Sequence, residues 1–134
     1  AMNQTDQTDR IVQHQTWARG LTETCYRASQ KTVSKLIPSA FYLSNLSSVN
    51  NAHDISSEKL AKNYFILWRV THDEVYREYA WQMAMAIEQN CKTISGGYSG
   101  VVDNVNQYPT SQEDYQPNEL LSATLKYLYL TFTE

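Results

Sequence analysis

Three histidines and two cysteines are the residues of this sequence with the widest chemical repertoire. The histidines are His14, His53 and His72, and an imidazole can act as a base or a metal ligand near neutral pH. Cys25 and Cys91 can form one disulfide or lie buried as two thiols, but two cysteines alone cannot build a zinc site. No cysteine lies close to a histidine in the sequence, so we expect structural or solvated histidines. A Cys–His nucleophile pair brought together by folding stays open.

Two further features could carry modification or bind phosphate. The tripeptides Asn3-Gln4-Thr5 and Asn45-Leu46-Ser47 have the form of N-glycosylation acceptors, so Asn3 and Asn45 are candidate glycan carriers. Three glycines lie within residues 96–100, where they follow a helical pattern instead of a strand. This order does not support a phosphate-cradling loop, so we interpret these glycines as turn formers.

The composition indicates one folded domain. The chain has 134 residues, of which 42% are hydrophobic and 12% aromatic, enough to bury a compact core. The net charge is only -3 and the 11 Lys and Arg residues are scattered, so no nucleic-acid partner is expected. The longest apolar stretches, such as residues 64–68, are far shorter than the roughly 20 residues that a membrane span needs. We therefore expect no association with a membrane.

The elements that must position these residues are predicted to be helices. Residues 1–8 are polar and aperiodic and predict a flexible terminus. The next segment, residues 9–36, predicts a first helix, which Pro38 ends before a long loop over residues 44–57. Its apolar face recurs at intervals of three and four residues and consists of Ile11, His14, Ala18, Leu21, Cys25 and Ala28.

Two more helices are predicted in the middle of the chain. One begins at Ser56 or Ser57, either of which can cap it, and ends near Val70. The other begins at Thr71-His72-Asp73-Glu74, which has the form of a capping box, and ends near Lys92.

The C-terminal part predicts a short hairpin and a last helix. Residues 98–102 can form a hairpin strand, and Pro117 suits the first position of the helix that follows. The fold class is therefore all-α, a compact bundle of about four helices in a single domain over residues 9–134. Its core should contain Tyr64, Phe65, Trp68, Tyr76, Tyr79, Met83, Leu125 and Leu128.

Several motifs occur in one order along these elements. They are residues 21–26, residues 67–81, Ala86-Ile87-Glu88 with Cys91-Lys92-Thr93, residues 96–100 and residues 124–130. Together they resemble glycoside hydrolase family 47, the class I α-1,2-mannosidases. The resemblance implies a fragment of an (α/α) barrel, corresponding to the C-terminal part of inverting, calcium-dependent enzymes. We therefore expect a truncated and degenerate relative of these enzymes.

The acidic positions of that family are occupied by other residues in this chain. The family's Gly-Leu-x-Pro-Glu aligns with residues 35–39 and places Ser39 at the acid. Its Arg-Pro-Glu motif, in which Arg contacts sugar and Glu activates water, aligns with Ser57-Glu58-Lys59, and the next acid falls at Lys62. Two later acids align with Pro117 and Ala123, and the family's calcium-holding Thr-Glu segment would lie beyond Glu134.

These losses predict a pseudoenzyme with no catalytic residue, no metal and no cofactor. Inversion needs two carboxyl groups about 6.5 to 9.5 Å apart. The neighbouring acids Glu58 and Glu119 do not replace the lost ones, because a helix turns about 100° per residue and they point elsewhere.

Three functions are consistent with this pattern. The first is a non-catalytic, secreted interaction or effector-like protein, because helices that faced barrel neighbours need another cover, either a partner protein or a second copy. The second is a mannose- or glycan-binding lectin that uses Tyr98, Tyr108 and Tyr115. The third is a residual calcium-dependent α-1,2-mannosidase with acids from unmatched positions. In each case we expect the protein outside the cell or in the secretory-pathway lumen.

Overall fold

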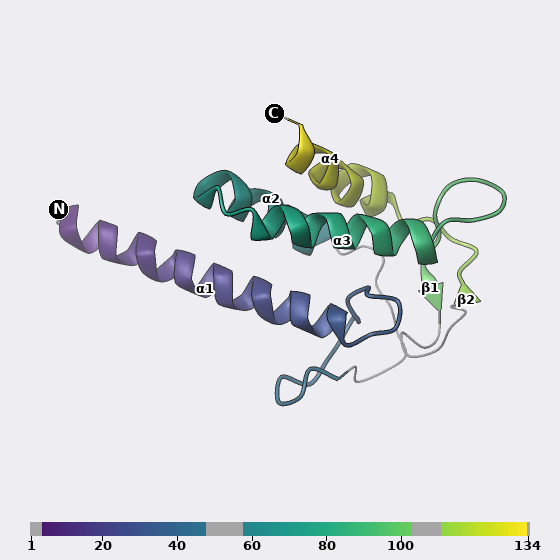
Figure 1. Cartoon of the computed structure of the whole chain (residues 1–134), viewed down its shortest axis with the longest axis horizontal. Coiled ribbons are helices and arrows are strands. Elements are labelled where there is room, and N and C mark those ends of the chain that lie inside the picture. The colour runs from purple at the N-terminus through teal and green to yellow at the C-terminus, as the bar shows by residue number, and fades with distance from the viewer. Residues whose placement is uncertain (1–3, 48–57, 103–110, 134) are drawn as a thin grey trace.

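Helices form nearly all of the regular structure. The computed structural model describes residues 4–47, 58–102 and 111–133. The elements in chain order are α1 (Gln4–Gln30), α2 (Glu58–Thr71), α3 (Val75–Asn90), β1 (Val101–Val102), β2 (Ser111–Gln112), the π-helical η1 (Leu120–Leu125) and α4 (Lys126–Phe132) (Figure 1). The predicted all-α class is confirmed, and so is the short hairpin after the third helix.

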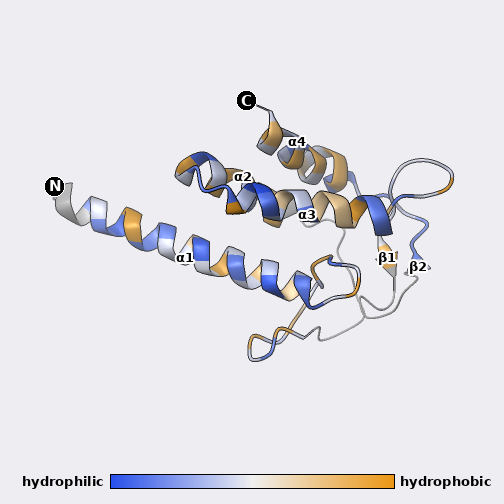
Figure 2. Ribbon diagram, viewed as in Figure 1, coloured by the Kyte–Doolittle hydropathy of each residue, from blue (hydrophilic) through white to orange (hydrophobic). Residues whose placement is uncertain are grey.

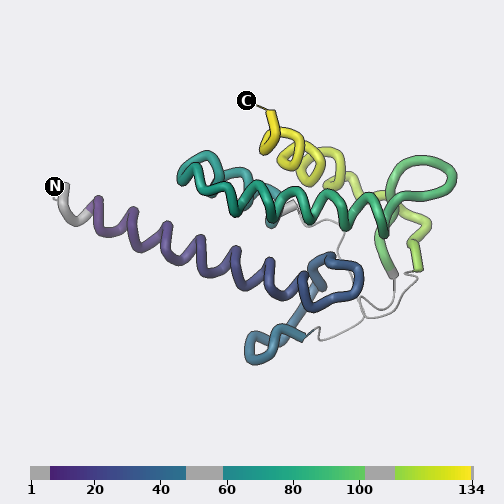
Figure 3. The backbone as a smooth tube through the Cα atoms, in the orientation of Figure 1, coloured from purple at the N-terminus to yellow at the C-terminus, as the bar shows by residue number. Residues whose placement is uncertain are grey.

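The bounds of α1 differ from the prediction at both ends. The helix begins at Gln4, so residues 4–8 of the expected flexible terminus are helical. No proline or glycine interrupts the sequence before Gly20, so nothing stops the helix from extending through these polar residues. It ends at Gln30 instead of Leu36, because the Thr32 hydroxyl lies 2.7 Å from the Ser29 carbonyl and 2.8 Å from the Leu36 carbonyl. Lys35 then adopts a φ of 60°, and Figure 3 shows the chain forming a loop after the end of α1.

Only the C-terminal part of α1 is attached to the other helices. Ala28 is fully buried and Cys25 is half-buried, as the predicted stripe requires. Ile11 and Leu21 of the same stripe are 50% and 68% exposed, so this part of the prediction is wrong. Figure 1 shows the N-terminal half of α1 extending beyond the rest of the bundle, and in Figure 2 its hydrophobic residues are separated along the helix by hydrophilic ones.

The junction of α2 and α3 is capped by a different residue from the one predicted. Thr71 is the last residue of α2, where its hydroxyl donates to the Leu67 carbonyl. The N-cap position is Glu74, whose side chain makes no capping bond; instead Asp73 Oδ1 accepts from the backbone N of Val75, the first residue of α3, at 3.2 Å. Glu74 does not reach back and instead pairs with Arg77 at 3.5 Å.

The core lies where α2, α3, η1 and α4 pack together. Of the predicted core residues, four are buried: Tyr64, Tyr76, Met83 and Leu128. The other four are half-buried at its edge: Phe65, Trp68, Tyr79 and Leu125. The predicted core is therefore placed correctly, although half of it is less deeply buried than expected.

A short hairpin and a π-helix complete the structure. In the hairpin, Val101 pairs with Gln112 and Val102 with Ser111, in antiparallel register. Gly97 in the preceding turn has a φ of 83°, which a residue with a side chain rarely adopts. The last helix follows Pro117 as predicted, but it begins as a π-helix in which the hydroxyl of Thr124 is buried without a hydrogen-bond partner. Among the helices of residues 4–47, 58–102 and 111–133, none combines the length and apolar character needed to cross a bilayer.

Candidate functional site

The positions where the family resemblance predicts acids lie on α2, η1 and the segments before them. Lys59 and Lys62 are exposed on the first turns of α2, and Lys62 Nζ is 6.0 Å from the ring centre of Tyr127 in α4. Ala123 is half-buried in η1, which packs against α2. Pro117 is half-buried just before the last helix, and Ser39 is exposed in the segment after α1. At the Lys62 position the chain therefore presents an ammonium group near an aromatic ring where the family resemblance predicts a carboxylate.

The donor set around these positions does not fit the calcium ion that the family resemblance implies. Calcium prefers six to eight oxygen ligands, several of them carboxylates. Glu119 is exposed, and the side chain of Glu58 lies outside the described residues. Throughout the part of the chain that the structure describes, no three His, Cys, Asp or Glu side chains gather into a group that could hold a metal.

The described histidines and cysteines do not show the features of a reactive site. His14 contacts Trp17 and His72 contacts Trp68, each with ring centroids 5.7 Å apart, and both histidines are exposed. The two cysteines are free thiols, so the disulfide alternative is not realised. Burial raises the pKa of Cys91 to about 12 and also raises the pKa of Cys25, which makes both poor nucleophiles. His53 lies outside the described residues.

Only some of the candidate glycosylation sites and glycan-contacting tyrosines lie within the described residues. Asn45 is exposed, and its Oδ1 accepts from both the backbone N and the hydroxyl of Ser47. Asn3 and Tyr108 lie outside the described residues. The segments of Tyr98 and Tyr115 are brought together, because the backbone N of Tyr98 donates to Gln116 Oε1 and that of Gly100 donates to the Tyr115 carbonyl. Tyr115 is exposed and Tyr98 is half-buried.

Tyr98 belongs to a polar cluster that sequence analysis did not identify. Its hydroxyl donates to Glu88 Oε2 at 2.7 Å, and the Lys92 ammonium donates to Glu88 Oε1. The hydrogen bonds from Lys92 and Tyr98 hold the pKa of Glu88 below its usual value. The same bond to Glu88 raises the pKa of Tyr98. A sugar bound here would therefore find both carboxylate oxygens of Glu88 already engaged.

A mostly apolar groove lies between α3 and α4. It has a volume of about 520 Å³, and the Glu88 cluster lies at one end. A second hollow of about 490 Å³ continues it past Trp81 and Phe132 toward Arg77. The sequence contains a pattern that could have indicated this groove. On the side of α3 away from the core, four residues recur at helical spacing: Trp81, Ala84, Met85 and Glu88. We call this surface, lined by Trp81, Met85, Leu125, Tyr129 and Phe132, the α3–α4 groove.

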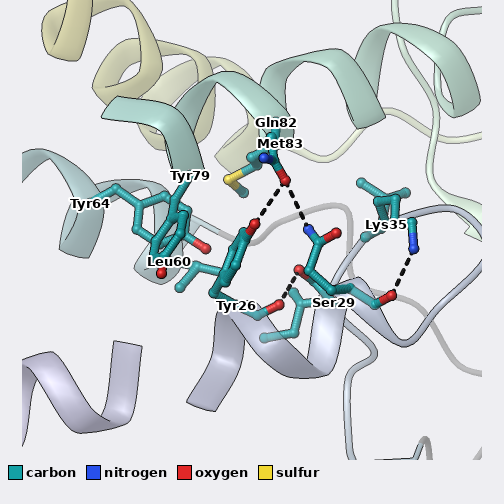
Figure 4. A pocket seen from close by; sticks show the side chains of 11 residues that line it. Tyr26, Ser29, Lys35, Leu60, Tyr64, Tyr79, Gln82 and Met83 are labelled. Atoms are coloured by element: carbon teal, nitrogen blue, oxygen red, sulfur yellow. Dashed lines mark hydrogen bonds between the residues drawn. The ribbon is translucent and has the colours of Figure 1, made fainter. Parts of the chain in front are cut away.

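A smaller cavity between α1 and α3 is a packing feature (Figure 4). Its volume of about 10 Å³ is at the lower limit for a single water molecule. Tyr26 and Gln30 of α1 both donate to Gln82 Oε1 of α3, at 2.9 and 3.2 Å, and Figure 4 shows Tyr26 beside Gln82. The cavity therefore lies at the contact between α1 and α3.

Comparison with known proteins gives one consistent family. A sequence profile of glycosyl hydrolase family 47 matches residues 1–134. The chain is 35% identical to mannosyl-oligosaccharide alpha-1,2-mannosidase IA of Drosophila melanogaster, over 100% of this chain and 20% of that protein. It is 33% identical to the human 1,2-alpha-mannosidase IC, over 87% of this chain and 19% of that protein.

A third relative is more distant. The chain is 27% identical to the mouse endoplasmic reticulum mannosyl-oligosaccharide 1,2-alpha-mannosidase, over 90% of this chain and 20% of that protein. The chain thus spans about a fifth of the length of the curated relatives it matches. With a family profile that matches every residue and a relative that is 35% identical over the whole of this chain, the chain belongs to glycosyl hydrolase family 47.

Proposed function

We propose that this chain is a non-catalytic interaction protein built on a mannosidase-derived scaffold. The observation that carries the proposal is the pair of exposed ammonium groups on α2. Lys59 and Lys62 stand where the family resemblance places carboxylates. An ammonium group can neither activate water as a base while protonated nor attract calcium, and at short range it repels the ion.

Two observations on neighbouring elements support the same conclusion. Ala123 in η1 and Pro117 before it have no acidic group to offer where the resemblance places two further acids. Restoring a carboxylate at position 59 alone would therefore leave the second carboxyl group of the inverting pair unsupplied.

The interaction role is supported by apolar side chains that the described fold leaves exposed. Trp17 and Leu21 on α1 are 57% and 68% exposed, and Trp81 and Tyr129 in the α3–α4 groove are 53% and 70% exposed. Contiguous apolar surface of this kind marks sites of protein association. Glycan binding is less well supported, because the groove is mostly apolar and the hydroxyl of Tyr98 is already bonded to Glu88. A glycan array carrying α-linked mannose would detect that alternative.

For location we propose the secretory pathway or the extracellular space. The support is membership of glycosyl hydrolase family 47 and the name of the mouse relative, which places that protein in the endoplasmic reticulum. An effector role would additionally require that the chain be secreted.

Calcium titration tests this proposal apart from catalysis. Isothermal titration calorimetry of the unaltered chain, of Lys59→Glu and of Lys31→Glu should give no heat of specific calcium binding. Lys31 is an exposed lysine just after α1, so Lys31→Glu makes the same charge change away from the family's acid positions. Tight calcium binding by the unaltered chain would overturn the proposal.

A further inference from the structure

We propose that the α3–α4 groove receives the stretch of α1 from Ile11 to Leu21 from a second copy of this chain. The inference rests on the proposed function, because it assigns this family member a binding role and names its partner. It uses two exposed apolar surfaces that the fold places on opposite sides of α3.

The donor surface is one stripe of α1. Ile11, His14, Trp17 and Leu21 share a helix face at intervals of three and four residues, and Ile11, Trp17 and Leu21 are 50%, 57% and 68% exposed. This stretch of α1 is already helical, and only Ala18, Arg19 and Leu21 within it lie near α2 or the α2–α3 junction of their own chain. Docking it therefore requires little additional ordering of the backbone.

The acceptor surface is the α3–α4 groove. Trp81 and Phe132 meet edge to face, with ring centroids 6.0 Å apart, where the two hollows join. Trp81, Phe132, Met85 and Tyr129 are all at least 38% exposed. Laying an apolar helix face into such a groove is a common way for one protein to recognise another.

The lengths and areas of the two surfaces match. Ile11 and Leu21 are ten residues apart, about 15 Å along the helix, and the groove follows α3 from Arg77 to Glu88, about 16 Å. The exposed parts of Trp81, Tyr129 and Phe132 amount to roughly 300 Å² at about 200 Å² per aromatic side chain. The α1 stripe offers a similar area. Together the two apolar areas come to about 600 Å². Because the apolar part is a little over half of a typical interface, the whole contact would bury about 1,100 Å². An interface of this size suits weak but specific association.

The donor must come from another copy because of where α1 is fastened. Tyr79 and Gln82 on one side of α3 hold α1 through Tyr26, whereas Trp81 and Met85 point to the groove on the other side. A chain therefore cannot fill its own groove with its own α1. The contact is head-to-tail, and each copy has one free helix and one free groove.

Sedimentation velocity across a concentration series tests this arrangement. The unaltered chain should self-associate between about 10 and 300 µM, whereas Leu21→Glu in the helix and Tyr129→Glu in the groove should each weaken association at least tenfold. Val12→Glu, on the opposite side of α1 from Leu21, and Ile94→Glu, outside the groove, are matched controls that should behave like the unaltered chain. Circular dichroism confirms that each variant is folded, and Trp17→Glu replaces Leu21→Glu if needed.

Mixing the two variants is the decisive step. Leu21→Glu retains an intact groove and Tyr129→Glu retains an intact helix, so their equimolar mixture should form one-to-one dimers and nothing larger. The proposal is overturned if the unaltered chain stays monomeric, if the mixture does not associate, if Leu21→Glu still self-associates, or if a control loses association. Failure of the proposed function would instead appear as calcium binding or release of mannose.

Discussion

Tyr26 of α1 and Tyr79 of α3 stack with ring centroids 3.6 Å apart and their planes 13° from parallel. The Tyr79 hydroxyl also donates to Glu23 Oε2 at 2.6 Å, so two residues of α1 are held by one side chain of α3. N-terminal to Thr22, by contrast, the large apolar side chains of α1 that the structure describes are exposed. The attachment of this long helix therefore depends mainly on its last three turns, with one exposed ion pair from Arg19 to Asp73 just before them.

Replacing Tyr26 by alanine should loosen this attachment. We expect a loss of about 2 kcal/mol in the free energy of unfolding, because the ring is half-buried and loses both its stacking and its bond to Gln82. Hydrogen exchange should rise across residues 22–30 and change little in α2 and α3. Trp17→Ala, on the exposed half of the same helix, is the control and should change the stability of the dilute protein by less than about 0.5 kcal/mol.

Trp68→Ala should destabilise the protein less than a core deletion would. Full burial would make the loss about 3 to 5 kcal/mol, but Trp68 is half-buried, with the guanidinium of Arg77 5.2 Å from its ring centre. We expect about 2 kcal/mol in denaturant melts. Tyr64→Ala, at a residue only 1% exposed, should cost about 3 to 5 kcal/mol. Equal losses for the two variants would show that Trp68 is as deeply buried as Tyr64.

Both cysteines should titrate as free thiols. In concentrated guanidinium chloride without reductant, Ellman's reagent should find two thiols per chain. In the native protein at about pH 8, Cys91 should react only as fast as the protein opens, since a pKa of about 12 leaves roughly one thiolate in 10⁴. Cys25→Ser isolates this slow phase. Rapid labelling of Cys91 in that variant would show that its thiol is accessible.

The stability of the protein should fall above about pH 10. Burial raises the pKa of Tyr64 above its ordinary value near 10, so the folded state retains a proton that the unfolded state releases. The stabilisation is complete below pH 10 and is lost as the pH rises above it. Between pH 9 and 11, Tyr64→Phe should lose about 1 kcal/mol less stability than the unaltered chain. Parallel pH profiles from urea melts would show that Tyr64 does not control this loss.

The sequence predicted the helices well because their signals are local. Apolar spacing over residues 60–68 and 76–87 and the turn residues near Gly97 are enough to place α2, α3 and the hairpin. The predicted face of α1 was wrong for most of its length. Periodicity shows that a helix has an apolar side, but it does not show whether another element is present to cover that side.

The candidate site, too, was predictable from the sequence only in part. That Lys59 and Ala123 replace acids is evident from the motif alignment, because identity at a position is a property of the sequence. The joining of Tyr98, Glu88 and Lys92 depends on a turn that brings residue 98 back beside α3. The α3–α4 groove depends on two helices meeting across a long separation in the chain, which no local pattern predicts.

We propose that this chain lacks mannosidase activity. The most direct test is release of free mannose from α-1,2-linked oligomannose by the unaltered chain, with calcium and with a chelator, beside a boiled control and an active family member. We predict no release above the boiled control under either condition, and no recovery in Lys59→Glu. Calcium-dependent release that the chelator abolishes would contradict the claim.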